Sequence, residues 1–397
     1  MQFGYLGCCR KRGGADAILV MKYLLVPDKF KGSATAHEVV GALAQGIKQS
    51  QPEAIIHTII ASDGGDGFLD CIASAQPIER ISASTKNALQ QPITADFGFD
   101  PTTKTAYIEL AQASGLAQLA GQSYSILKTS TFGTGLQIQQ ALAKGAQHLV
   151  LGLGGSATND AGMGIASALG VTFLDVDGKP IKPCSGNLFD IHQLFLPVNN
   201  PLEGIGVTVV NDVTNPLLGP RGAVATYAPQ KGATAEEMKV LEKGLQHLAQ
   251  LLDAVTGGTY STTPGAGAAG GTAYGIAQLF SAKLCTGAEF LLEYTPLAQW
   301  VAKESYTYII TGEGAWDEQS LQGKVVGTVC LLAAQHHIPV VIVCGTAAVK
   351  MIETPPAGVQ KVLPLKTAVR SASYCMKNAK SLIASEIAVF LNQKAAK

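Results

Sequence analysis

The sequence lacks the patterns of a cysteine metal site, a membrane-spanning helix and a nucleic-acid-binding surface. None of its eight cysteines forms a Cys-x-x-Cys pair, and their scattered apolar settings are typical of reduced cysteines in a cytoplasmic protein. No apolar run approaches the ~18–20 residues that a membrane span requires. The 29 basic residues balance 29 acidic ones without forming a basic run. We therefore expect neither a nucleic acid nor a membrane as partner.

Length and composition indicate two well-packed domains. The chain has 397 residues, and single hydrophobic cores usually stop growing at ~250–300 residues. Hydrophobic residues make up 47% and charged residues 15%, which leaves ample material for burial. The first twenty residues lack the order of a signal peptide, and Met21 opens a clean strand pattern. We predict that residues 1–20 are an extension outside the fold.

Strand and helix patterns alternate at both ends of the chain, which predicts parallel strands covered by helices. Strand candidates at 22–26 and 55–61 flank a helix at about 35–49, which Ser33 or Thr35 can cap, with Glu38 at capping-box spacing. Residues 77–116 instead alternate in the manner of an antiparallel piece. The expected fold is α/β: a Rossmann-like domain from residues 21–79 and 285–397, with a mixed α/β domain inserted at 80–284.

The stretch Thr311–Ser320 is predicted to be a loop after the apolar run Tyr308–Ile310. Its glycines favour a close backbone approach to a ligand, and it carries three carboxylates, Glu313, Asp317 and Glu318. Carboxylates so close together repel one another unless a cation or a substrate compensates. The alternative is a solvated turn in which Asp317 or Ser320 caps a helix.

A second glycine-rich stretch, Gly152–Ala157, follows an apolar strand and precedes a helix. Backbone N–H groups at such a place suit an anion. The stretch also fits the dinucleotide fingerprint G-x-G-x-x-A, with Asp175 and Asp177 near the spacing of a ribose-binding acid. An NAD(P)-dependent dehydrogenase of a small hydroxy acid is therefore an alternative function.

Phosphoryl transfer explains more of the chain. It needs an anion-binding backbone, a cationic side chain, a carboxylate for a divalent metal and a group that orients the attacking hydroxyl. No P-loop motif occurs, but polar residues of the required kinds follow several apolar strands. They are Lys29, Lys31, Ser33, Asp63, Asp66, Asn211, Asp212 and Arg221. Taken singly, each lysine is more often solvated and each aspartate as often a turn or cap residue, so only their joint placement favours a site.

Five motifs follow one another along the chain: Pro27-Asp-Lys-Phe-Lys-Gly-Ser33, Asp63-Gly-Gly-Asp-Gly67, Gly154-Gly-Ser-Ala-Thr-Asn-Asp-Ala-Gly-Met-Gly164, Asn211-Asp-Val-Thr-Asn-Pro216, and Thr311-Gly-Glu-Gly314 with Asp317 and Gln319. In this order they resemble the signature of the bacterial glycerate kinase family. Members of that family phosphorylate glycerate with ATP and a divalent cation, and their fold is a Rossmann-like domain with an inserted α/β domain. The resemblance covers nearly everything from Met21 to the end.

The resemblance implies ATP-dependent phosphorylation of D-glycerate with Mg²⁺, in an interdomain cleft of a cytoplasmic enzyme that could form homo-oligomers. We expect Asp317 to orient or deprotonate the attacking hydroxyl, Asp63 or Asp212 to hold the metal, and Lys29 and Lys31 to meet phosphate or carboxylate. Five residues are expected to bind the cofactor: Gly154, Gly155, Ser156, Ala157 and Asn159. The remaining expected substrate contacts are Ser33, Asp66, Asn211, Arg221 and Glu313.

Two positions depart from the family pattern. Asp66 stands where members often have glutamate, and Ala315-Trp316 where they often have an arginine. The first change keeps the charge, whereas loss of a substrate-binding arginine could alter specificity. A non-catalytic sensor of phosphorylated metabolites is a further alternative, but it would not need carboxylates at several strand ends. Which hydroxyl is phosphorylated, and which motif faces ATP, stay open at this stage.

Overall fold

The structure is a computed structural model that describes residues 20–62, 64–321 and 324–395. It divides into two compact units. Unit 1 contains the described residues of Met1–Ser62, Asp70–Gln76 and Ala288–Lys397, and unit 2 those of Asp63–Leu69 and Pro77–Gly287. The domain boundaries predicted at residues 80 and 285 stay predictions. The predicted extension at residues 1–20 lies almost wholly outside the described residues.

Unit 1 is built on a parallel five-stranded sheet in the order β14-β13-β12-β1-β2. Its strands are β1 (Lys22–Pro27), β2 (Ile55–Thr58), β12 (Tyr308–Trp316), β13 (Val340–Ala347) and β14 (Val359–Pro364). Alternate residues of β1 join different cores: Tyr23 and Leu25 belong to one cluster, and Leu24 and Val26 to another. The sheet is thus buried on both faces, as parallel sheets normally are.

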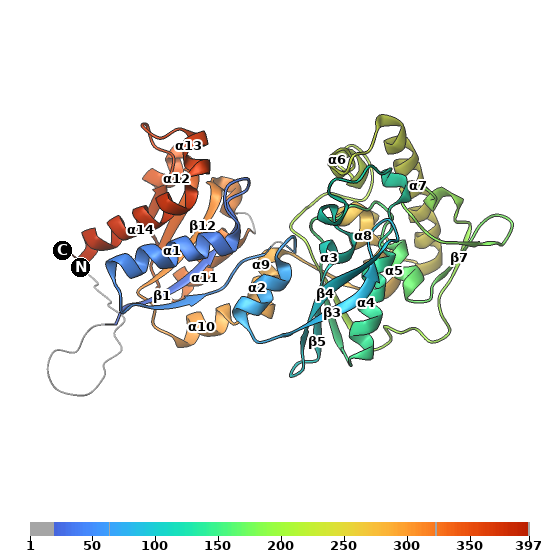
Figure 1. The fold of residues 1–397 in the computed structure, drawn as a ribbon, viewed down its shortest axis with the longest axis horizontal. Helices are drawn as coiled ribbons and strands as arrows, with labels where there is room; N and C mark the ends of the chain where they lie inside the picture. The colour runs from blue at the N-terminus through green and yellow to red at the C-terminus, as the bar shows by residue number, and fades with distance from the viewer. Residues whose placement is uncertain (1–19, 63, 322–323, 396–397) are drawn as a thin grey trace. The chain divides into compact units, whose positions relative to one another are not determined.

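Helices form the outer layers of unit 1. They are α1 (Ala36–Ser50), α10 (Leu297–Lys303), α11 (Val325–Gln335), α12 (Val349–Glu353), α13 (Ala372–Lys377) and α14 (Ala379–Ala395), while α2 (Phe68–Ala75) and α9 (Gly287–Tyr294) cross unit boundaries. In Figure 1, α1 and α14 lie side by side, and residues of both join the core cluster of Tyr23 and Leu25. The predicted capping box is confirmed, because the Thr35 side chain accepts from Glu38 N and the Glu38 carboxylate accepts from Thr35 N.

The contact between α1 and α14 predicts opposite effects for two glycines of one helix. A Cβ on Gly46 would lie 2.3 Å from the Ala384 carbonyl oxygen, whereas a Cβ on Gly41 would meet nothing within 4 Å. We expect Gly46→Ala to lower the free energy of unfolding by about 1–3 kcal/mol through overpacking. Gly41→Ala is expected to raise it by about 0.5–1 kcal/mol through helix propensity. Urea denaturation followed by circular dichroism measures both, and equal effects would contradict the packing.

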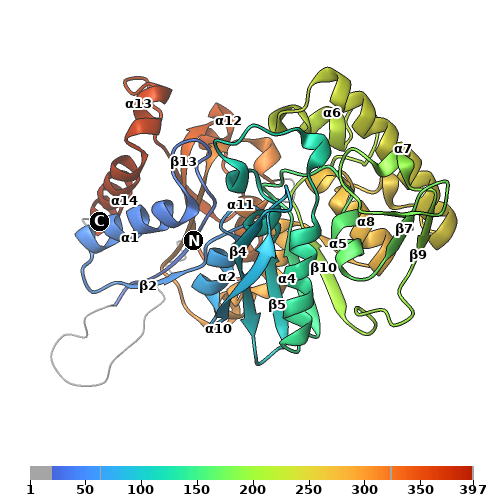
Figure 2. The same ribbon diagram turned by 45° about the vertical axis from the view of Figure 1, so that its right-hand side comes forward.

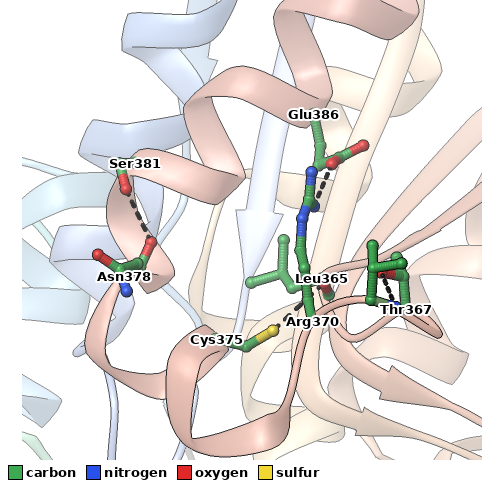
Figure 3. Close-up of polar contacts among 8 residues, drawn as sticks. Leu365, Thr367, Arg370, Cys375, Asn378, Ser381 and Glu386 are labelled. Carbon is green, nitrogen blue, oxygen red and sulfur yellow. Dashed lines mark hydrogen bonds and ion pairs between the residues drawn. The ribbon is translucent and has the colours of Figure 1, made fainter.

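Polar contacts fix the segment that connects β14 to α14 (Figure 3). The Arg370 guanidinium donates to Glu386 Oε1 over 2.5 Å, and Cys375 Sγ donates to the Leu365 carbonyl over 3.3 Å. Ser381 Oγ donates to the Asn378 carbonyl at the start of α14. The first two contacts join α14 and α13 to the segment that follows β14, and the third lies within the start of α14.

Unit 2 contains a mixed six-stranded sheet in the order β11-β10-β6-β5-β4-β3. Its strands are β3 (Glu79–Lys86), β4 (Pro92–Asp100), β5 (Thr105–Glu109), β6 (His148–Gly152), β10 (Gly206–Val210) and β11 (Lys283–Cys285). Strands β3, β4 and β5 pair antiparallel, which confirms the antiparallel piece predicted from the sequence. Strands β5, β6, β10 and β11 are parallel. Together the two sheets confirm the α/β fold class.

One face of the mixed sheet is covered by helices whose residues share its core. The helices of unit 2 are α3 (Leu110–Ser114), α4 (Phe132–Ala143), α5 (Met163–Ala168), α6 (Ala223–Tyr227), α7 (Ala235–Thr256) and α8 (Ala268–Phe280). Of these, α4 lies along β3 and β4 (Figure 2), and α5 and α8 complete the layer. Within the described ranges, no helix is both long and apolar enough to span a bilayer.

A small antiparallel sheet in unit 2 removes the structural basis of the dehydrogenase alternative. Its strands are β7 (Thr172–Leu174), β8 (Pro180–Ile181) and β9 (Gln193–Phe195). A dinucleotide fingerprint belongs to a strand–helix–strand unit whose two strands are parallel members of one sheet. Here the strand that follows β6 and α5 is β7, and β7 belongs to the small sheet instead. Asp175, expected near the ribose, instead accepts from Asp177 N and Lys179 N within a turn.

Candidate functional site

The expected site residues fall in both units, so each group is described within its own unit. Unit 1 carries Lys29, Lys31, Ser33, Glu313 and Asp317. Unit 2 carries Asp66, Gly154, Gly155, Ser156, Ala157, Asn159, Asn211, Asp212 and Arg221. Asp63, expected to be catalytic and to bind the metal, lies outside the described residues.

In unit 1 the structure corrects the loop predicted at Thr311–Ser320. Strand β12 continues to Trp316, because its backbone pairs with β1 as far as Gly312 and with β13 as far as Trp316. A Cβ on Gly312 would lie only 1.9 Å from the Val343 carbonyl oxygen. The glycine therefore permits close strand packing rather than ending the strand.

The segments after β1 and along β12 bring the expected residues of unit 1 to one edge of its sheet. Pro27 pairs with Gly312, and Asp28 N donates to the Gly312 carbonyl over 2.8 Å. Further along, a Cβ on Gly314 would lie 3.5 Å from Lys31 N. These contacts place Lys29 and Lys31 on the loop that runs beside Glu313. Ser33 Oγ donates to the Phe30 carbonyl within that loop.

The carboxylates of this edge differ in environment. Burial raises the pKa of Glu313, with Ser320 and Lys324 acting in the opposite direction, and its Oε1 is buried without a hydrogen-bond partner among the described residues. Asp317 Oδ1 accepts from Ser320 N over 3.3 Å, which caps the short 3₁₀ helix Glu318–Leu321. Asp317 thus has the capping contact that the alternative interpretation required, and a catalytic role would be additional to it.

Trp316, which with Ala315 stands where the resemblance led us to expect an arginine, is only 1% exposed. Its ring packs in the apolar cluster that also contains Val325 and Ile342. Trp316 therefore cannot contact a substrate as an arginine would. The neighbouring Ala315 is exposed but has no polar group with which to bind one.

In unit 2 a cavity of about 320 Å³ opens at the carboxyl ends of β6 and β10. These strands are parallel neighbours, so the loops that follow them meet at one edge of the sheet, where open α/β sheets bind ligands. The cavity wall includes Gly154–Ser156 after β6, Asn211–Val213 after β10, and Lys231. Arg221 is exposed and does not line this cavity.

The glycine loop, Gly152–Ala157, is held against the segment that contains Asp66. Gly154 N donates to the Gly64 carbonyl over 2.8 Å, and a Cβ on Gly154 would lie 2.2 Å from Gly65 Cα. Ala157 N donates to the Ser114 carbonyl. Two of the N–H groups expected to bind an anion are therefore used inside the protein. Among the described residues, the N–H groups of Gly155 and Ser156 have no such partner.

Asp66 lies directly beside this loop, because a Cβ on Gly155 would come within 2.5 Å of its Oδ1. The position of Asp66 depends on Glu109, a residue that the sequence reasoning missed. Glu109 is buried at the end of β5 and accepts from Gly67 N and Leu69 N, and its burial raises its pKa. Its only sequence signal is a carboxylate that ends an apolar strand.

Beneath the glycine loop, Asp160 accepts four hydrogen bonds although it is completely buried. They come from Thr131 N and Oγ1 and from the N–H groups of Gly162 and Gly164. Asn159 is equally buried, and neither polar atom of its side chain has a partner among the described residues. Such atoms usually bind a ligand or water, since leaving one unpaired costs about 1–3 kcal/mol.

Lys231 is the other functional residue that the sequence reasoning missed. It ends the 3₁₀ helix Pro229–Lys231, and only 3% of it is exposed. Its Nζ donates to Ser156 Oγ over 2.8 Å and to the Thr158 carbonyl over 2.6 Å. Burial lowers the pKa of Lys231 to about 7, with the Asp160 carboxylate acting in the opposite direction. Nothing in the local sequence distinguishes this lysine from a solvated one.

The cavity wall contains oxygen atoms of the kind that bind magnesium. Asn211 and the exposed Asp212 follow β10 and supply amide and carboxylate oxygens. Within the described part of the chain, no group of three or more histidine, cysteine, aspartate or glutamate side chains could hold a metal by itself. Mg²⁺ is commonly held by one or two carboxylates together with substrate phosphates. Asp212 and Asn211 supply oxygens of this kind, and these oxygens also accept from Gly287 N over 3.2 Å and from Val213 N over 3.3 Å.

Comparison with known proteins gives the same family along nearly the whole chain. The model of the glycerate kinase family matches residues 23–392. The chain is 38% identical to a glycerate kinase of Bacillus cereus over 87% of this chain and 91% of that relative. It is 34% identical to the glycerate 2-kinase of Escherichia coli, over 90% and 94%. A crystal structure from Salmonella typhimurium LT2, provisionally assigned as a glycerate kinase 2, superposes with a TM-score of 0.80 at 30% identity, covering 95% of this chain and 99% of that one.

Proposed function

Because this chain belongs to the glycerate kinase family, we propose that it transfers the γ-phosphoryl group of ATP to a hydroxyl of D-glycerate. Glycerate phosphorylation follows from the family, and ATP as donor follows from the kinase class. Use of Mg²⁺ is proposed from the oxygen ligands in unit 2. When bound, Mg²⁺ would neutralise phosphate charge.

The observation that carries the use of ATP is the cavity of unit 2. It combines N–H donors of Gly155 and Ser156 with the carboxylate of Asp212 at one end of a parallel strand pair. This combination of anion-binding backbone and metal-binding oxygen is what a nucleotide triphosphate requires. We propose that these groups hold the phosphates, and that Asn211, Asp66 and the buried amide of Asn159 support the same region.

We propose that the edge of unit 1 acts on the acceptor. Asp317 would orient the attacking hydroxyl or accept its proton, and Lys29 and Lys31 would meet phosphate or the glycerate carboxylate. Positioning and charge neutralisation would supply most of the rate, as is general for phosphoryl transfer. Contacts from Ser33, Glu313, Arg221 and Asp63 to substrate or metal stay proposals, as does a reaction site between the two domains.

Two properties beyond the reaction are also proposed. The six cysteines that the structure describes are free thiols, which supports a reducing compartment and hence the cytoplasm. Assembly into a homo-oligomer stays a proposal that size-exclusion chromatography with light scattering can test.

The test is turnover of D-glycerate with ATP and Mg²⁺, with the phosphorylated product identified by ³¹P NMR. We expect wild-type protein to give stoichiometric ADP and phosphoglycerate. The relative from Escherichia coli is named a glycerate 2-kinase, so the expected product is 2-phosphoglycerate, and 3-phosphoglycerate would contradict only the position. Absence of turnover with D-glycerate, in protein shown to be folded by circular dichroism, would contradict the function.

A further inference from the structure

Lys231 has an unusual charge environment for a buried lysine. Among the residues that the structure describes, it is the only lysine or arginine that is fully buried, and neither of its hydrogen bonds goes to a carboxylate. Burying an ammonium group without a paired negative charge is costly. The Asp160 carboxylate acts on Lys231 without a hydrogen bond to it. A ligand in the cavity of unit 2, which Lys231 lines, would supply a directly bonded negative charge.

The geometry leaves Lys231 able to serve such a ligand. An ammonium group has three N–H donors, and two of them are directed to Ser156 Oγ and the Thr158 carbonyl. Ser156 belongs to the glycine loop and Thr158 follows it directly, so the ammonium is anchored beside the N–H groups of Gly155 and Ser156. The third donor is left for an occupant of the cavity, and the long side chain has little freedom to move away.

We propose that Lys231 binds an oxyanion in the cavity of unit 2 and is the cation that neutralises its charge. This inference rests on the proposed kinase function, because it takes the oxyanion to be a phosphate group of ATP. The carboxylate of D-glycerate has the same chemistry and is the other source that the test distinguishes. A lysine and backbone N–H groups are a common pair for phosphate.

The surroundings of Lys231 couple oxyanion binding to protonation of its amine. Its pKa of about 7 means that much of the free protein carries a neutral amine at pH 8. Among the described residues, the titratable groups near it are Asp160, the cavity-lining Asp212 and Tyr227, and Tyr124, whose hydroxyl donates to the Lys231 carbonyl. An oxyanion added to this set raises the pKa of Lys231, so binding at pH 8 takes up a proton.

Isothermal titration calorimetry tests the inference on the whole protein. ATP without metal and D-glycerate are titrated separately at pH 8, each in two buffers of different ionisation enthalpy. We expect wild-type protein to take up protons on binding ATP. Lys231→Met is expected to bind ATP about 10- to 100-fold more weakly, the loss of a hydrogen bond to a charged group, and without proton uptake. Lys239→Met is the matched control, since this lysine is exposed on α7.

The outcomes separate this inference from the proposed function. Loss of affinity for D-glycerate instead of ATP supports the oxyanion site and assigns it to the carboxylate. Wild-type affinity and proton uptake in Lys231→Met overturn the role of Lys231, even where the turnover test succeeds. Wild-type protein that binds ATP at pH 8 without taking up a proton overturns the link between binding and protonation of Lys231, and that measurement does not depend on the variant folding. If Lys231→Met binds ATP more weakly but the wild type shows no turnover, the oxyanion site is supported and the proposed kinase function is contradicted.

Discussion

Alanine in place of Gly312 is expected to lower the free energy of unfolding by about 3 kcal/mol, the upper end of the usual cost of overpacking. The added Cβ would lie 1.9 Å from the Val343 carbonyl oxygen, a distance at which backbone has to move. Neither neighbour can yield easily, because β12 is paired with β1 on one side and with β13 on the other. Gly312 also accepts a hydrogen bond from Asp28 N, which connects the strand to the loop of Lys29.

Gly314 provides the matched control two residues along the same strand. Its Cβ would meet nothing closer than Lys31 N at 3.5 Å, an ordinary contact distance. Gly314→Ala is therefore expected to change the free energy of unfolding by less than about 1 kcal/mol. Urea denaturation of both variants makes the comparison, and equal stabilities would show that the two glycines are retained for another reason than strand packing.

The same glycines show where sequence reasoning reached its limit in unit 1. Glycine and acidic residues after an apolar run normally indicate a strand end, and on that basis the strand was predicted to stop at Ile310. The strand continues because it is central to the sheet and has partners on both sides, a fact of tertiary structure. By contrast, the cap at Thr35 and Glu38 was predictable, since it depends on residues three positions apart.

The site in unit 2 divides in a similar way. The sequence predicted only that Gly154–Ser156 and Asn211-Asp212 each follow an apolar strand. In the structure they line one cavity because β6 and β10 are parallel neighbours that end at the same edge of the sheet. Lys231 and Glu109 could not be predicted, because whether a charged residue is buried depends on distant parts of the chain. The number of N–H groups open to an anion was also not predictable, because Gly154 N and Ala157 N donate to the Gly64 and Ser114 carbonyls inside the protein.

Replacing Asp317 by asparagine is expected to lower kcat by at least about 10²-fold, the lower end for general acid–base catalysis. Asparagine has nearly the same shape, and its side-chain oxygen can still accept from Ser320 N, as Asp317 Oδ1 does. The cap of Glu318–Leu321 is thus kept while the negative charge is lost. KM for D-glycerate should change much less than kcat, because the lost interaction acts on the reacting proton.

Glu318→Gln separates a specific role of Asp317 from a general need for charge on this segment. Glu318 is the adjacent carboxylate, but it is exposed and paired with Lys350 over 2.7 Å, so its variant is expected to keep kcat within about twofold, since an exposed ion pair contributes little. Steady-state kinetics of both variants decide the assignment. A wild-type kcat in Asp317→Asn would contradict a role for Asp317 in the reaction and leave it only the capping role that the structure shows.

In that case Glu313→Gln is the next variant to measure. Burial raises the pKa of Glu313 and so makes it a better proton acceptor than an ordinary glutamate.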